Sequence, residues 1–94
     1  MADMIWDANE QIDFDYLLNL TSQKFVDVIT DEMDLKMSFK GIKVTKNSDS
    51  TVDVIVVREA FVRVFTWYSF NDSFDTTLIA KSDLSWVLEV INND

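Results

Sequence analysis

Apolar positions recur at intervals of three and four residues in the first third of the chain, a spacing typical of an amphipathic helix. Asp13 is a good N-cap, and Asp15 falls in the first turn, where the helix dipole favours an acid. We predict a helix over residues 13–33. Because apolar and polar residues also alternate over 13–20, a short strand before a helix beginning near Thr21 stays open. The periodic positions are Phe14, Leu17, Leu18, Thr21, Phe25, Val28, Ile29 and Met33.

From Leu35 the apolar period changes to two, as Met37 and Phe39 alternate with polar neighbours. This alternation predicts a strand. The chain's only glycine, Gly41, shifts the phase of the alternation, which indicates a β-bulge. The pattern ends in a polar connector, residues 46–51, which has the length of a hairpin loop.

Residues 52–68 are nearly all β-branched or aromatic, the strongest strand signal in the sequence. The run is too long for one ordinary strand, so we split it at Arg58-Glu59 into strands over 52–57 and 60–70. The split lacks the Gly or Asn that a two-residue turn prefers. A single long bent strand is therefore the alternative.

The last quarter of the chain predicts a loop and a second helix. Residues 71–73 are the loop, and residues 76–80 are either a short strand or the beginning of that helix. Ser82 is the expected N-cap of a helix over residues 83–92. Its apolar stripe consists of Leu84, Val87, Leu88 and Ile91.

These elements predict one α+β domain over residues 1–94, with an N-terminal helix, a three- to four-stranded antiparallel sheet and a C-terminal helix in two layers. A chain of 94 residues buries only roughly 60–65% of its unfolded surface, which is enough for one small core. Both faces of the predicted sheet are apolar over residues 52–70. Either helices cover both faces, or one face pairs with another molecule and the protein is a homodimer.

Charge divides the chain into three parts, with 17 acidic and 8 basic residues and a net charge of -9 overall. Residues 1–34 hold nine acids against Lys24 alone, residues 35–70 hold six basic residues against three acids, and residues 71–94 hold five acids against one lysine. The net negative charge repels nucleic acids and anionic membranes, so we expect direct binding to neither.

The inventory of side chains argues against an enzyme. With no histidine, no cysteine and one glycine, the chain lacks the common general base, thiolate ligands and phosphate-binding loops. We expect no catalytic residue, no cofactor and no metal, since paired acids such as Asp49 and Asp53 lack the ligand count of a calcium loop. An acidic N-terminus without an apolar run indicates a soluble, cytoplasmic protein.

The acidic helix is the candidate functional feature. Asp27 and Asp31 are four residues apart, which places them roughly 6 Å apart along one helix face. Carboxylates held on a rigid element can imitate nucleic-acid phosphates, which are spaced at about 3.4 Å along each strand. The commoner interpretation is that the acidic helix is only a solvated surface. Alternatively, the acids pair internally with the lysines of residues 36–46, and no acidic surface is then available to a partner. The predicted partner-binding residues are Asp13, Asp15, Asp27, Asp31, Glu32 and Asp34.

In length, acidity and lack of catalytic side chains the chain resembles the small inhibitors that phages and mobile elements encode against host nucleases, the anti-restriction and anti-CRISPR proteins. The resemblance is one of type, without a shared residue motif. It implies an inhibitor that blocks a basic nucleic-acid-binding protein, such as a nuclease or CRISPR effector, in the cytoplasm of the host cell. The alternatives are an immunity protein or antitoxin for a cationic toxin, and a structural subunit that oligomerises through its apolar sheet.

Overall fold

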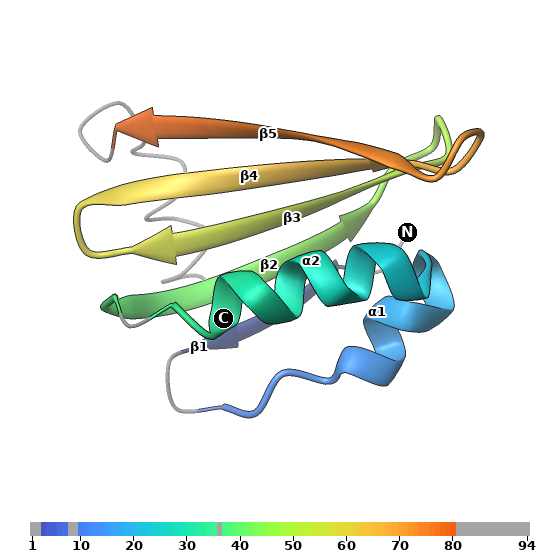
Figure 1. Cartoon of the computed structure of the whole chain (residues 1–94). Helices are drawn as coiled ribbons and strands as arrows, with labels where there is room; N and C mark the ends of the chain where they lie inside the picture. Colours follow the sequence, from blue (N-terminus) through green and yellow to red (C-terminus); the bar gives the residue numbers. More distant parts are fainter. Residues whose placement is uncertain (1–2, 8–9, 36, 81–94) are drawn as a thin grey trace.

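In the part of the chain that the structure describes, five antiparallel strands form one sheet, and two helices pack against one of its faces (Figure 1). The computed structural model describes residues 3–7, 10–35 and 37–80. The α+β class is confirmed, but the sheet has five strands rather than three to four, in the order β1-β2-β3-β4-β5. The elements are β1 (Asp3–Asp7), α1 (Phe14–Leu20), α2 (Gln23–Met33), β2 (Phe39–Lys46), β3 (Thr51–Arg58), β4 (Phe61–Tyr68) and β5 (Ser73–Ala80).

Strand β1 is the element that the sequence pattern did not predict. It pairs antiparallel with β2, from Asp3 opposite Thr45 to Asp7 opposite Gly41. Its apolar stretch is short and has an acid at each end, so the local pattern carries no recognisable period. Trp6 is nevertheless buried in the main core. Pairing with a distant strand therefore decides the conformation of this segment.

The predicted helix over residues 13–33 is divided into two helices. Helix α1 ends before Thr21, whose hydroxyl and backbone N–H both donate to the Leu17 carbonyl. Ser22 then has an extended backbone, and its side chain accepts from the N–H of Phe25 as the N-cap of α2. Serine and threonine favour such local bonds over a continuous helix. The first segment is a helix, which excludes the alternative of a strand over residues 13–20.

The hairpins follow the predicted divisions closely. The register of β2 against β3 shifts between Phe39 and Gly41, which confirms the bulge. Strand β3 ends at Arg58 and β4 begins at Phe61, so the long apolar run is two strands and not one bent strand. The stretch that was either a strand or the beginning of a helix belongs to β5, which starts earlier, at Ser73.

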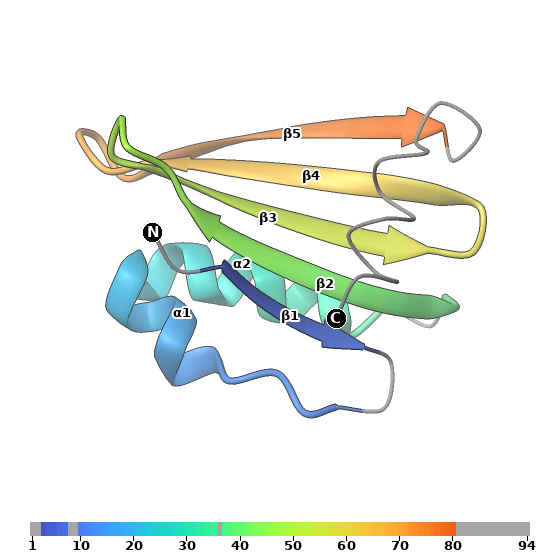
Figure 2. The same cartoon turned by 180° about the vertical axis from the view of Figure 1, so that it is seen from behind.

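Apolar side chains lie on both faces of the sheet. The main core lies between the sheet and the two helices, where Phe25 packs against Phe65, Trp67 and Phe74. Seen from behind, the helices lie beyond the sheet (Figure 2). A smaller second cluster lies on the sheet face opposite the helices, at the strand positions that alternate with those of the main core. Its members are Ile55, Val57 and Val62, with Val64 and Ile79 packed against them.

Two further expectations concern the C-terminal helix and the absence of a membrane-spanning segment. The predicted helix over 83–92 lies outside the described residues. Within them, neither α1 nor α2 is long and apolar enough to cross a bilayer.

Candidate functional site

Helix α2 carries two of the predicted acids on its outer face. The helix is amphipathic, with Phe25, Val26 and Ile29 buried against the sheet. Asp27 and Asp31 are exposed on the opposite side. Their separation of four residues corresponds to roughly 6 Å along the axis. A helix packed by its inner face thus holds two carboxylates in solvent at a fixed spacing.

The other exposed acids of the predicted set lie at or near helix ends. Asp13 is the N-cap of α1, accepting from the N–H of Tyr16 at 3.0 Å, and Asp15 follows in the first turn. The helix dipole favours both positions. Asp34 is the C-cap of α2, where the same dipole disfavours an acid. We define the acidic face as the exposed carboxylates of these two helices, Asp13, Asp15, Asp27, Asp31 and Asp34.

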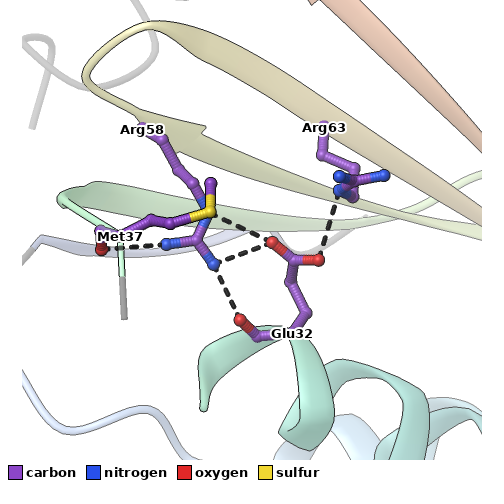
Figure 3. A network of polar contacts seen from close by, with 4 residues as sticks. All are labelled: Glu32, Met37, Arg58 and Arg63. Carbon is purple, nitrogen blue, oxygen red and sulfur yellow. Dashed lines mark hydrogen bonds and ion pairs between the residues drawn. The ribbon is translucent and has the colours of Figure 1, made fainter. Parts of the chain in front are cut away.

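Glu32 does not belong to the acidic face, although the sequence placed it there. Glu32 is only 7% exposed, and its carboxylate points toward the sheet (Figure 3). Arg58, which is 2% exposed, donates to Glu32 Oε2 from Nη2 at 2.7 Å and from Nε at 3.1 Å. Glu32 can be buried because charge-assisted hydrogen bonds from Arg58, both to Oε2, compensate its charge.

Arg58 also completes the end of α2. Its Nη2 donates to the Glu32 carbonyl at 2.7 Å and its Nη1 to the Met37 carbonyl at 3.2 Å (Figure 3). The last carbonyls of a helix have no partner within the helix, so the guanidinium supplies one. Arg63 Nε lies 3.2 Å from Glu32 Oε1 as an ion pair without a hydrogen bond. This Glu32–Arg58–Arg63 network joins α2 to β3 and β4.

The described basic side chains do not form ion pairs with the acidic face. No ion pair there joins any of its five aspartates to a basic side chain. Lys24, the only basic residue of the first 34, donates to the Asp72 carbonyl at 3.1 Å. Lys40 pairs with Glu59 at 2.9 Å, and Lys43 lies in register with Ile55, on the sheet face opposite the helices. No described lysine therefore forms an ion pair with the acidic face, and Lys36 lies outside the described residues.

Asp72, in the turn between β4 and β5, is an anchoring residue that sequence reasoning missed. Its Oδ1 accepts from the Ser22 hydroxyl and from Trp67 Nε1 at 2.8 Å. Its φ of 52° lies in the left-handed region that Asp and Asn tolerate better than most residues. The hydrogen bond from Ser22, followed by that from Trp67, lowers the pKa of the Asp72 carboxyl. The contact fastens the start of α2 to the sheet.

We predict that the stabilising effect of the Asp72 charge depends on pH. A folded-state pKa below the ordinary value stabilises the fold above about pH 4, and this is lost as the pH falls through the folded pKa. The variant Asp72→Asn keeps an acceptor and tolerates the positive φ. Urea unfolding should show wild type more stable than the variant at neutral pH, with the difference shrinking in acid. A constant difference across this range would contradict the assignment.

Two open depressions lie on the surface of the described residues. One open depression of about 400 Å³ is formed by the single segment 11–15. A second, of about 180 Å³, lies between Leu20, Lys46 and Trp67. Among the described residues, no group of three acids approaches closely enough to hold a metal ion. The acidic face remains the candidate functional site.

Comparisons with known proteins add no family to this description. No protein-family model matches the chain, and searches of curated proteins and of solved structures found no match. The assignment of a function therefore depends on the surface itself.

Proposed function

We propose that the protein is a small non-catalytic inhibitor that binds a basic nucleic-acid-binding protein or nuclease through the acidic face. The proposed class is a phage-encoded anti-CRISPR or anti-restriction protein that acts as a nucleic-acid mimic in the cytoplasm of the host cell. The partner would be a protein with a cationic cleft, not a nucleic acid or a membrane.

One observation carries the proposal: five exposed aspartates lie on two helices without an ion pair to any described basic side chain. Such a concentration of like charge costs self-repulsion. Asp34 adds to this cost, because it lies at the negative end of the α2 dipole. Binding to a cationic surface would relieve both penalties, and a purely solvated helix would not.

The anchoring of α2 also supports a mimic. Its inner face is fixed by the core around Phe25 and by the Glu32–Arg58–Arg63 network. The outer carboxylates consequently keep their spacing without a partner. A preorganised charge pattern binds at lower entropic cost than a flexible acidic tail. Long-range attraction to a cationic cleft would accelerate association and would weaken as salt screens it.

We predict that the double variant Asp27→Asn/Asp31→Asn loses the partner while it keeps the fold. The tagged wild-type protein should retain a basic nucleic-acid-binding protein from host lysate at low salt and release it at high salt. Nucleic acid added to the column should compete for the same partner, since the proposal places both ligands in one cleft. The variant should retain at least about tenfold less, because two charge-assisted contacts are removed.

A matched control removes the same charge elsewhere. Asp49→Asn/Glu59→Gln takes two negative charges from the hairpin turns and leaves both helices intact. This variant should retain the partner nearly as well as wild type. Equal loss in both variants would mean that net charge alone governs capture, and equal retention in both would mean that the acidic face is only a solvated surface. Either result rejects the mimic.

A further inference from the structure

The outer side of β5 is an open edge of the sheet as far as the described residues go. Strand β5 pairs with β4 along its whole length, from Ser73 opposite Tyr68 to Ala80 opposite Phe61, without a shift in register. No other described strand pairs with it. Alternate N–H and C=O groups of such an edge point away from the sheet, which makes it a template for another strand.

Strand β5 lacks the features by which proteins usually protect an edge. It contains no proline and no lysine, and Asp75 is its single charged residue. It also has no bulge. The opposite edge, β1, is shorter, with five residues and an aspartate at each end. Regular, weakly charged and eight residues long, β5 is the edge better suited to pairing.

A second copy of this chain fits the β5 edge. The acidic face lies on α1 and α2, and in both views β5 is the strand at the edge away from α1 (Figures 1 and 2). Two copies joined there would keep their most acidic surfaces apart. Leu78 is 59% exposed on the helix side of β5, in register with Arg63. Pairing would cover this apolar side chain.

We propose that β5 pairs antiparallel with β5 of a second copy about a two-fold axis at Thr76, which joins two sheets into one. An axis perpendicular to the sheet brings residues of the same face opposite each other. Residues 73–79 then pair with residues 79–73 of the second copy. Phe74 lies opposite Leu78 of the second copy, an aromatic–aliphatic pair on the helix side.

Neighbouring registers are less favourable. An axis at Asp75 would place the two Asp75 carboxylates directly opposite each other, which is destabilising. An axis at Thr77 would place Asp75 opposite the apolar Ile79. With the axis at Thr76, Asp75 lies opposite Thr77 of the second copy, which can donate a hydrogen bond to it. Charge and polarity therefore select Thr76.

Disulfide trapping tests both the dimer and its register, because the chain has no native cysteine. In Thr76→Cys the two cysteines would face each other at a Cα separation of roughly 4.5–5.5 Å, within disulfide range. In Thr77→Cys the separation would be roughly 8 Å, beyond that range. Under mild oxidation we expect dimer from Thr76→Cys and at least about tenfold less from Thr77→Cys. Equal trapping, or none, overturns the proposal.

Sedimentation of cysteine-free protein gives an independent test. Wild type should show a concentration-dependent monomer–dimer equilibrium. Leu78→Lys should raise the dimer dissociation constant at least about tenfold, because each copy loses a buried leucine at the interface. Leu35→Lys, which removes an exposed leucine after α2, should leave the constant unchanged. A wild type that stays monomeric throughout, or equal effects of both variants, overturns the proposal.

Discussion

Replacing Arg58 by methionine should lower the free energy of unfolding by about 3–5 kcal/mol, because it leaves the Glu32 carboxylate buried without its principal partner. The substitution also removes the donor to the Glu32 and Met37 carbonyls. Methionine keeps most of the side-chain volume, so a cavity contributes little. Equilibrium urea unfolding measures the loss.

The Lys40–Glu59 pair provides the control for Arg58→Met. The pair lies at the surface, with side chains 50% and 62% exposed and an N–O distance of 2.9 Å. Lys40→Met should cost less than about 1 kcal/mol, since solvent screens an exposed ion pair. If Arg58→Met proved as mild as Lys40→Met, the buried network would not be what fixes α2 to the sheet.

Replacing Phe25 by alanine should cost about 3–5 kcal/mol, an effect as large as that of Arg58→Met. Phe25 is 1% exposed, and its ring lies 5.9–6.5 Å from the rings of Phe65, Trp67 and Phe74. Alanine would leave a cavity between α2 and the sheet. The same unfolding measurement, with the slope against denaturant checked for two-state behaviour, gives the value.

Phe70→Ala is the matched control for Phe25→Ala. Phe70 lies in the turn after β4 and is 84% exposed, so its truncation removes little buried surface. We expect a change within about 0.5 kcal/mol. A large loss in Phe70→Ala, or a small one in Phe25→Ala, would show that the core is not centred where α2 contacts the sheet.

These stability variants separate the two kinds of acid on α2. Glu32 belongs to the buried network, so Glu32→Gln should act mainly on unfolding. Asp27 and Asp31 are exposed, so their amide variants should act mainly on partner capture. Sequence reasoning grouped all three because charge alone does not distinguish a solvated carboxylate from a paired one.

Part of this distinction was already present in the periodicity. Glu32 follows Phe25 and Ile29 at helical spacing, on the stripe that packs inward. Arg58 has the same alternation as Val54 and Val56, which places it on the helix side of β3. That the two residues meet depends on how α2 crosses the sheet. The spacing within each element could not reveal it.

Local pattern determined the elements whose signals repeat within a few residues. The outward position of Asp27 and Asp31 follows from the period of a helix, and the Gly41 bulge from a change of phase within a strand. The division near Arg58-Glu59 follows from the limited length of strands. Each of these features is fixed by neighbours in sequence, and the residues alone predicted them.

Only the tertiary structure decided the features that depend on distant partners. Strand β1 forms because β2 supplies its hydrogen bonds, and Asp72 holds α2 because a turn 50 residues away from Ser22 returns to it. Glu32 is buried because two arginines from neighbouring strands compensate its charge. The sequence pattern shows the period of each element, but these contacts form only when the elements pack. Packing decides which charged and hydrogen-bonding groups are buried next to each other.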